Sequence, residues 1–468
     1  MSRIVQIGGG VVGLCTALLL ARDGHDVAVL ERDALAPTDP GTAWDAWQRR
    51  GVNQFRLLHY FLPRFREVME ANLPDVISTM EDAGALRFNP LEAMPAEFSG
   101  GVGPDDTRYT SVTARRPVAE AAIAQLVAAT PEITMRRGAA VTSLLARDNG
   151  SEVPHVVGVR LENGDEVRGD VVIDAGGRRS ALPSLLDAIG ARQVVEEKAD
   201  SGFVYYGRHF RSGDGSVPAL FGPLLMQYGS ISILTLPADN GTWGVGIITG
   251  ARDSQLRAAR DAGVWERVVK SYPLAAHWVD GEPLEDTPVV MASIEDRHRT
   301  FVVDGVPVAT GVLAVGDAWS CTNPSVGRGI SIGAIHAVAL RDLLADGPQD
   351  PVELACRWHD ATQRSAEPWF RGTLAYDEGR LAEIDALLDG RDFQPDLEYE
   401  MVQALQNAAG KDPQMLRRTL ALAGALDLPE EIFSQPGVAE QTMALGGDWR
   451  SNGLPGPDRD GLVQVVQA

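Results

Sequence analysis

The sequence has only three cysteines, and they lie far apart in the chain. Cys15, Cys321 and Cys356 form neither a CxxC pair nor the regular spacing of a disulfide framework. The lack of a CxxC pair excludes dithiol redox chemistry, and scattered thiols are typical of a protein kept in a reducing compartment. The sequence also lacks an HExxH motif and any cluster of cysteines and histidines, so no metal site is expected.

Positive charge and long hydrophobic runs are scarce as well. The 468 residues include 42 lysines and arginines against 64 aspartates and glutamates, which gives a formal net charge of −22. This negative excess disfavours a nucleic-acid partner. The apolar run from Val11 to Ala21 is too short to cross a bilayer, so no transmembrane segment is expected. Together these features predict a cytoplasmic protein.

A glycine-rich turn stands at the start of the chain. An apolar run over residues 3–7 predicts a buried strand, and residues 11–22 predict a helix that ends before Gly24. Between them lies the sequence GGGVVG over residues 8–13, and residues 26–31 predict a second strand. This strand–turn–helix–strand pattern with a GxGxxG turn is typical of a dinucleotide-binding unit.

Each residue of this turn has an expected role. Gly8 permits the tight turn, Gly10 lets a pyrophosphate approach the backbone, and Gly13 lets the helix pack closely on the strand. The free N–H groups of the helix start attract phosphate. Glu31 can accept hydrogen bonds from the adenosine ribose. The predicted cofactor contacts in this unit are Gly8, Gly10, Val12, Gly13, Glu31 and Arg32. The pattern alone does not distinguish FAD from NAD.

Two further segments of the sequence distinguish between FAD and NAD. They read VVIDAGGRRSALPSLL over residues 171–186 and GVLAVGDAWSCTNPSVGRGISIGAIHA over residues 311–337. With the glycine-rich unit, and in the same order and spacing, they resemble the FAD-dependent group of para-hydroxybenzoate hydroxylase-like aromatic hydroxylases, squalene-epoxidase-like enzymes and flavin halogenases. The resemblance extends from about Arg3 to Leu344 and implies that the chain binds FAD.

The last block contributes the flavin end of this site. A predicted strand delivers Gly316 and Asp317, whose carboxylate can accept a hydrogen bond from a ribityl hydroxyl. Pro324, Gly327 and Gly329 then form a turn into a helix, whose N-terminus favours the negative charge of a reduced flavin.

The resemblance implies three more contacts. Asp174 and Gly177 are expected near the pyrophosphate, although DAGG stands here where the family has Asp-Gly, which leaves the nicotinamide partner open. Arg116 matches the family's FAD-contacting arginine, with the adjacent Arg115 as the alternative.

The resemblance also implies the fold class, which is α/β. It comprises a Rossmann-type FAD-binding domain with an inserted β-sheet substrate domain and a mainly helical C-terminal region. The FAD-binding domain is expected to span residues 1–75, 110–182 and 296–350, the substrate domain 76–109 and 183–295, and the helical region 351–468. Apolar spacing predicts a helix over residues 53–72, and the Gly-, Pro- and Asp-rich tail is predicted to be loosely ordered.

The implied activity is that of an FAD-dependent monooxygenase. Such an enzyme uses molecular oxygen to hydroxylate or epoxidise a small, largely apolar or aromatic molecule through a flavin C4a-hydroperoxide. The electrons are expected from NADH or NADPH, or from a separate flavin reductase, and a reductase partner or a homodimer stays open. Because the flavin carries the chemistry, no catalytic side chain is assigned. His59 is considered for the flavin face, with helix packing as the alternative.

Two alternatives stay open. One is a halogenase or a prenyl-type reductase on the same fold, and the other is a flavin-binding protein without turnover. Trp44 and Trp47 in AWDAW superficially resemble the halogenase tryptophan motif but lack its Ile-Pro, so they are interpreted as loop or packing residues. Alternation along the strand-rich segment near residues 202–248 predicts five residues of the substrate pocket, namely Tyr205, Tyr206, Arg208, Met226 and Trp243.

Overall fold

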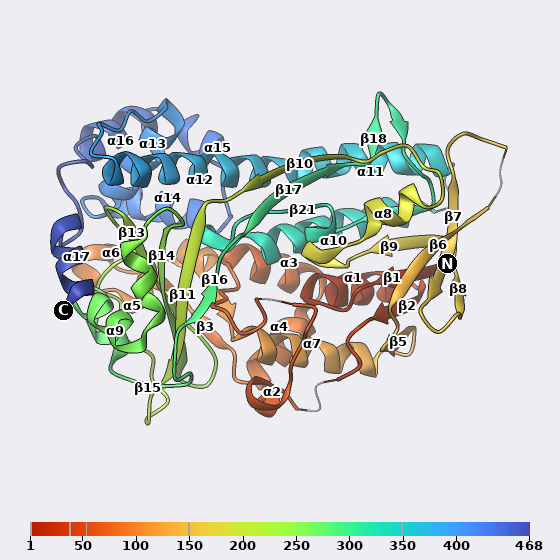
Figure 1. Cartoon of the computed structure of the whole chain (residues 1–468), viewed down its shortest axis with the longest axis horizontal. Coiled ribbons are helices and arrows are strands. Elements are labelled where there is room, and N and C mark those ends of the chain that lie inside the picture. Colours follow the sequence, from red (N-terminus) through yellow and green to blue (C-terminus); the bar gives the residue numbers. More distant parts are fainter. Residues whose placement is uncertain (1, 37–38, 53, 148–149, 348–349) are drawn as a thin grey trace.

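The computed structural model describes residues 2–36, 39–52, 54–147, 150–347 and 350–468 (Figure 1). A five-stranded parallel sheet in the order β20-β9-β1-β2-β5 forms one end of the molecule (Figure 1). In chain order these strands are β1 (Arg3–Ile7), β2 (Asp26–Glu31), β5 (Ile133–Arg137), β9 (Val171–Asp174) and β20 (Val312–Ala314). The carboxyl ends of parallel strands lie at one edge, where open α/β sheets bind their ligands.

Alternate residues of the parallel sheet face two different layers. Ile4, Val27 and Ile173 pack on the helical side, which is formed by α1 (Val11–Arg22), α7 (Arg116–Ala129) and α10 (Gly329–Ala345). Val5 and Val172 face the opposite side. That side is covered by the antiparallel sheet of β6 (Val141–Arg147), β7 (His155–Leu161) and β8 (Glu166–Arg168). Successive residues of a strand point to opposite faces, and both faces of this sheet are covered. The strands are therefore apolar at nearly every position.

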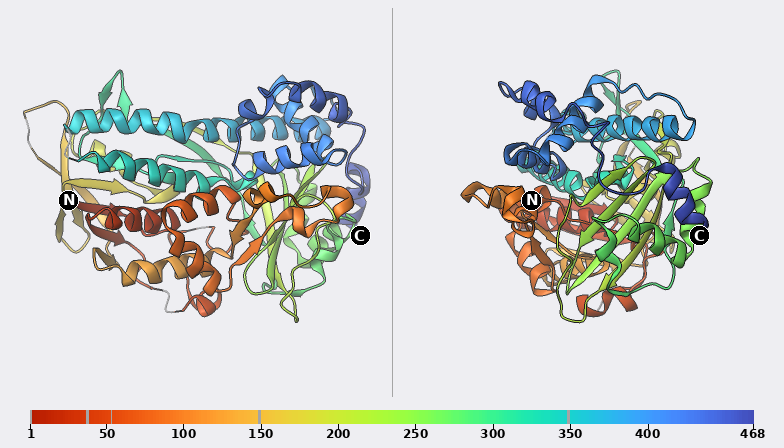
Figure 2. Two further views of the ribbon diagram at one scale, coloured as in Figure 1. Left: turned by 180° about the vertical axis from the view of Figure 1, so that it is seen from behind. Right: turned by 90° about the vertical axis from the view of Figure 1, so that its left-hand side faces the viewer.

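A larger antiparallel sheet forms the other end of the molecule (Figures 1 and 2). Its main order is β12-β13-β14-β11-β15, and β16 also pairs with β11. The strands are β11 (Phe203–Arg211), β12 (Leu225–Tyr228), β13 (Ile231–Pro237), β14 (Thr242–Gly250), β15 (Glu282–Pro283) and β16 (Val289–Met291). A small sheet connects the two ends; its strands are β10 (Val195–Asp200), β17 (Glu295–Thr300) and β21 (Ser320–Cys321).

The chain after residue 350 is mainly helical. Its helices are α11 (Pro351–Ser365), α12 (Glu367–Leu388), α13 (Leu397–Ala409), α14 (Pro413–Ala423), α15 (Pro429–Phe433), α16 (Val438–Gly446) and α17 (Arg459–Gln467). The remaining main helices are α2 (Pro40–Ala46), α3 (Pro63–Asn72), α4 (Pro74–Asp82) and α9 (Ala262–Lys270). Helices α11, α12, α13 and α16 lie above the sheets in Figure 1, and α17 lies at the side, next to α9. This arrangement confirms the predicted mixed α/β class. The predicted domain boundaries stay a prediction.

The predicted helix over residues 53–72 is wrong in its first half. Helix α3 begins only at Pro63, and residues 54–62 form turns and extended chain. Proline has no N–H and favours the first helical position, so it starts a helix here and does not continue one. Phe55 and Phe61 are buried in separate places, which produces the apolar spacing without a helix. Asn53 lies outside the described residues.

The expectation of a loosely ordered tail is also wrong. Asp458 caps α17 by accepting a hydrogen bond from the Gly461 N–H, and Leu462 is buried in the main core. Arg459 pairs with the buried Asp253. The tail therefore belongs to the fold and covers the large sheet beside α9. In the described part of the chain, no helix is both long and apolar enough to span a membrane.

Candidate functional site

The glycine turn after β1 is shaped by close backbone contacts. Gly8 has a φ of +98°, and a Cβ added there would lie 2.4 Å from the Ala175 carbonyl oxygen. A Cβ at Gly13 would lie 2.5 Å from the Gly8 carbonyl oxygen. Gly10 differs, because its added Cβ would meet only Nη2 of Arg116, at 3.8 Å. Gly8 and Gly13 therefore serve packing, whereas Gly10 keeps open space at the start of α1.

The N-terminus of α1 faces that open space without a side-chain cap. Gly10 is the capping residue and has no side-chain acceptor for the N–H groups of the first turn. Such free N–H groups, with the helix dipole behind them, bind phosphate. Arg116, the first residue of α7, adds a cation beside Gly10. This arrangement fits the pyrophosphate of FAD.

The choice between the two adjacent arginines is decided by their partners. Arg115 is bound to the buried Asp239, to which both its backbone N–H and its guanidinium donate hydrogen bonds, at 2.7 Å and 2.6 Å. Arg116 lines a large cavity that begins at the glycine turn. There its Nε donates to Glu120 at 3.1 Å, and its Nη1 lies 3.5 Å from Nε2 of His59. The structure therefore brings Arg116, and not Arg115, to the glycine turn.

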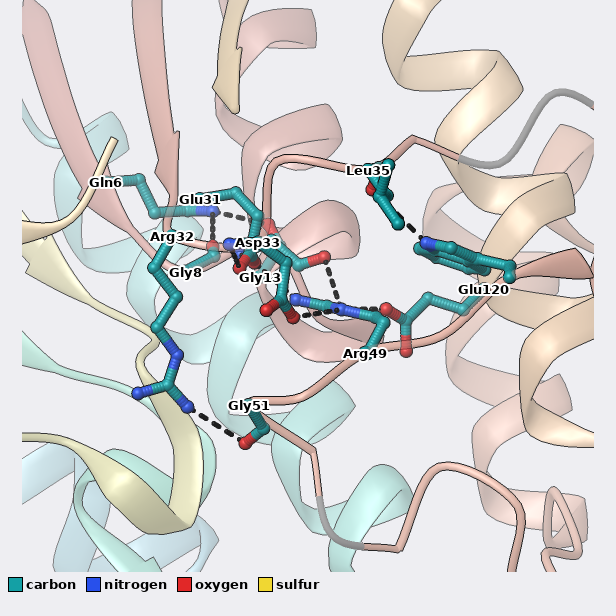
Figure 3. A network of polar contacts seen from close by, with 12 residues as sticks. Gln6, Gly8, Gly13, Glu31, Arg32, Asp33, Leu35, Arg49, Gly51 and Glu120 are labelled. Atoms are coloured by element: carbon teal, nitrogen blue, oxygen red, sulfur yellow. Dashed lines mark hydrogen bonds and ion pairs between the residues drawn. The ribbon is translucent and has the colours of Figure 1, made fainter. Parts of the chain in front are cut away.

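Glu31 ends β2 in a buried polar network (Figure 3). Its carboxylate accepts hydrogen bonds from the N–H groups of Gly9 and Asp33, each at 2.9 Å, and pairs with Arg49. Burial opposes ionisation, but Arg49 and the two N–H groups outweigh it, so the pKa of Glu31 is lowered. Glu31 does not itself line the cavity. Its role as the ribose ligand stays a prediction.

The last motif lies beside the start of α1, where a Cβ added at Gly316 would lie 3.1 Å from Cγ1 of Val12. Gly316 has a φ of +60°, and its N–H donates to Nδ1 of His336, which is buried against Trp358. Asp317 follows, and its Oδ1 would lie 3.6 Å from a Cβ added at Gly329. A short turn at Pro324–Val326 and Gly327, with a φ of +66°, then lead into α10. Asp317 and the N-terminus of α10 thus lie together, as the motif predicts for the flavin end.

A single cavity of about 870 Å³ connects these parts. The predicted cofactor residues that line it are Gly10, Val12, Gly13, Arg116, Gly177, Asp317, Pro324, Gly327 and Gly329. The predicted residues outside the lining are Gly8, Glu31, Arg32, Asp174 and Gly316. Arg32 is exposed and donates to the Gly51 carbonyl, while Asp174 is buried and accepts hydrogen bonds from Ser180 and the Gly176 N–H. Burial raises the pKa of Asp174.

Of the five predicted pocket residues, only Tyr205 lines this cavity. Its hydroxyl donates to Oδ1 of Asn323 at 2.6 Å. Tyr206, Arg208, Met226 and Trp243 are buried outside the lining. Trp243, for example, donates from its indole to the Trp278 carbonyl at 2.7 Å. Alternation along a strand separates two faces, but here both faces of the sheet are covered, so alternation could not identify the cavity side.

His59 lies in the cavity wall as a neutral side chain. Burial, followed by the Arg116 guanidinium, lowers the pKa of His59 to about 3. Nδ1 lies 2.9 Å from the Leu57 carbonyl, which can only accept, so this nitrogen carries the proton. His59 therefore holds no charge near neutral pH.

Several residues of the site have contacts that the sequence did not predict. Arg178 joins the middle block to the last one by donating to the Thr322 carbonyl at 2.6 Å. Asn323 connects Tyr205 to the buried Asp377 of α12, to which it donates at 3.1 Å. Arg49 and Arg328 are further examples. Their partners lie far away in sequence, so no local spacing could indicate them.

Comparison with known proteins agrees with this geometry. Residues 3–196 match the family of FAD dependent oxidoreductases. This part of the chain is similar to the FAD-dependent oxidoreductases. The matched residues include the first two of the three motifs, and the predicted resemblance to FAD-dependent oxidoreductases is confirmed, together with FAD as the cofactor and an oxidoreductase as the class of enzyme.

Three individual proteins extend the comparison beyond this region. Protein Rv3254 of Mycobacterium tuberculosis is 27% identical over 401 residues, which cover 79% of each chain. PqsL of Pseudomonas aeruginosa, described as a probable FAD-dependent monooxygenase, has a TM-score of 0.60 at 16% identity, covering 83% of this chain and 97% of PqsL. The Diels-Alderase PyrE3 has a TM-score of 0.57 at 17% identity, covering 92% of this chain and 82% of PyrE3. At these identities the two structures show that the fold is shared.

Proposed function

We propose that the protein is an FAD-dependent monooxygenase that transfers one oxygen atom from molecular oxygen to a small, largely apolar molecule. The observation that carries the proposal is the single cavity, which joins the FAD-binding turns to an apolar chamber. A reaction of this kind requires the cofactor and the substrate to share one space from which water is excluded.

One wall of this chamber is made of apolar side chains packed on a flat part of the large sheet. The wall is flat because glycines stand at two positions of that sheet. An added Cβ would lie 2.5 Å from Cδ1 of Leu58 at Gly207 of β11, and 3.3 Å from Cδ2 of Leu58 at Gly246 of β14. Leu58 therefore lies directly on the large sheet, and Leu234 and Ile248 line the same cavity. A wall of this composition favours an apolar ring or chain over a sugar or a peptide.

Two exposed aromatic side chains border the cavity. Phe98 and Phe221 are 60% and 57% exposed, and both line the cavity. Large apolar side chains in water at the rim of a pocket are typical of a surface that receives an apolar ligand. They support the same class of substrate as the chamber does.

The chain's own residues supply binding and orientation. When bound, FAD supplies the electron transfer and the chemistry with oxygen. The N-terminus of α1 and Arg116 hold the phosphates, and Asp317 holds the ribityl chain. Leu58 and the flat sheet orient the substrate and exclude water. Neutral His59 directs its Nδ1–H to the Leu57 carbonyl.

The overall reaction balances with one external reductant. One substrate molecule, one O₂, two electrons and two protons give the oxygenated product and one water. The electrons come from NADH, NADPH or a separate flavin reductase. The FAD-loaded protein should be incubated with each donor, ¹⁸O₂ and a library of apolar aromatic compounds and alkenes. One ¹⁸O atom in the product is the expected result.

Other outcomes would favour other reactions on this fold. A product that requires halide would indicate a halogenase, and turnover without oxygen would indicate a reductase. A product with the mass of its substrate would indicate a rearrangement or cyclisation, the kind of activity for which PyrE3 is called a Diels-Alderase. Any of these results would overturn the proposal, and so would a bound flavin that no donor reduces.

A further inference from the structure

Arg328 is a buried arginine in the wall of the cavity. It stands between Gly327 and Gly329, at the turn into α10, and is 8% exposed. Its protein contacts are weak: Nη1 donates to Thr373 Oγ1 at 3.4 Å, Nη2 donates to the Leu422 carbonyl at 3.3 Å, and the guanidinium lies 5.6 Å from the Trp369 ring. Among the described residues, none accepts a hydrogen bond from Nε and none forms an ion pair with Arg328.

Three other buried arginines of the protein form ion pairs with carboxylates, which Arg328 does not. Arg49 is paired with Glu31, Asp33 and Glu120, Arg299 with Glu196, and Arg380 with Glu383. Arg208, for which the described part of the chain also offers no ion pair, lies outside the cavity lining. Arg328 is thus a buried cation that is poorly paired and borders the space where ligands bind.

Asp377, which interacts electrostatically with Arg328, does not form an ion pair with it. Asp377 already accepts hydrogen bonds from Ser325 and Asn323, and burial raises its own pKa to about 7. Burial lowers the pKa of Arg328 to about 10, so the guanidinium is still charged at neutral pH. A buried charge without a carboxylate or phosphate partner is costly, and a ligand that brings an anion relieves this cost.

We propose that Arg328 binds an anionic oxygen group of the substrate, so that the substrate is a largely apolar molecule carrying one carboxylate or enolate. This inference rests on the proposed function and names the substrate class for the same cavity. A guanidinium has five N–H donors, and only two of them are used here, at long distances. The free Nε–H and a neighbouring Nη–H form the planar pair that holds a carboxylate with two hydrogen bonds.

Binding of two matched probes tests the proposal without turnover. The probes are 2-naphthoate and 2-naphthamide, which share an apolar ring system and differ in charge. Calorimetric titration of the FAD-loaded protein near pH 8 should give naphthoate a dissociation constant at least about tenfold lower than that of naphthamide, as expected for a charge-assisted contact. Because oxygen transfer is not measured, this result is independent of whether the protein is a monooxygenase.

Three variants assign the preference to Arg328. In R328Q the preference for naphthoate should fall below about twofold, and in R328K, which keeps the charge but loses the planar fork, it should be intermediate. R450Q is the control, since Arg450 lines the same cavity but is exposed and stacks on Trp449 at 5.2 Å. R450Q should keep the wild-type preference. Flavin content and thermal unfolding establish that each variant is folded.

Several outcomes would overturn the inference. They are equal binding of the two probes to the wild type, an absence of naphthoate binding, and an unchanged preference in folded R328Q. An equal loss of preference in R450Q would also overturn it, because the effect would then arise from the general field of the cavity. If R328Q does not fold, the preference for naphthoate over naphthamide in R328K and in the wild type tests the inference. Labelled oxygen in a neutral product, with no preference between the probes, would refute this inference and leave the proposed function intact.

Discussion

The guanidinium of Arg49 is ion-paired with the carboxylate of Glu31, and the two side chains are only 3% and 4% exposed. Arg49 also pairs with Asp33 and with Glu120 of α7, and it donates to the Gly9 carbonyl at 3.1 Å (Figure 3). One cation thereby joins the end of β2, the glycine turn and α7. It is shared by three carboxylates at the edge of the sheet where the adenosine is predicted to bind.

Replacing Arg49 with methionine should strongly destabilise the protein. Methionine keeps much of the length but leaves buried carboxylates without their cation, a change that costs about 3–5 kcal/mol in other proteins. The free energy of unfolding should be measured by chemical denaturation of the wild type and R49M. R50M is the matched control, because the neighbouring Arg50 is exposed, and its effect should be within about 0.5 kcal/mol. Equal effects of the two variants would contradict the role given to Arg49.

The contribution of this ion pair should disappear in acid. The pKa of Glu31 is lower in the folded protein than in the unfolded chain, despite burial, because of Arg49 and the N–H groups of Asp33 and Gly9. Its stabilisation is therefore complete above the unfolded pKa of about 4.3 and is lost as the pH falls through the lower folded pKa. The difference in unfolding free energy between wild type and R49M should shrink below about pH 4. A difference that stays constant down to pH 2.5 would count against this assignment.

Two glycines of the same motif should respond differently to alanine. G10A adds a methyl group to open space, so the apoprotein should keep its stability within about 1 kcal/mol while FAD binds at least about tenfold more weakly. G13A places a methyl group 2.5 Å from the Gly8 carbonyl oxygen and should lower both stability and FAD affinity. Thermal unfolding of the apoproteins and fluorescence titration with FAD measure the two effects. If G10A binds FAD as the wild type does, the pyrophosphate does not lie against Gly10.

Asp377 should make the protein less stable as the pH rises from 5 to 8. Burial raises the pKa of Asp377 to about 7, against hydrogen bonds from Ser325 and Asn323, whereas the unfolded value is about 3.9. Stability linked to this group is complete below the unfolded pKa and is lost as the pH rises through the folded pKa. Relative to D377N, the wild type should lose about 2–3 kcal/mol between pH 5 and pH 8. Parallel stability curves of the two proteins over this range would exclude the raised pKa.

The sequence was most informative where function depends on local chain geometry. The GxGxxG turn, Asp317 and the Pro324–Gly329 segment depend on glycine, proline and strand ends close together in the chain, so their spacing predicts them. The helix Val11–Arg22 has the predicted bounds, because Gly10 and Gly24 mark its two ends. Arg116 could be placed only to within one residue, since Asp239, which holds Arg115, lies 124 positions away.

Side chains placed by the packing of distant elements could not be predicted in this way. Trp243 and Met226 are residue types that often line pockets. Here they are buried in the core and not in the wall of the cavity. Arg328 stands within a recognisable motif, but its isolation is visible only once α12 and α14 lie beside it. The spacing of Phe55 and Phe61 resembles a helix, although tertiary contacts and Pro63 determine that segment.

The flat wall at Gly246 predicts where the substrate lies. Valine is compatible with a strand, but at Gly246 its Cβ would approach Leu58 Cδ2 at 3.3 Å and its methyl groups would enter the chamber. G246V should therefore weaken 2-naphthoate binding about tenfold and change the FAD dissociation constant less than about twofold. Calorimetry with each ligand measures both constants. G213V is the control, since Gly213 is exposed and an added Cβ there meets nothing within 4 Å. Unchanged naphthoate binding in G246V would move the substrate site away from Leu58, toward the part of the cavity formed by the C-terminal helices.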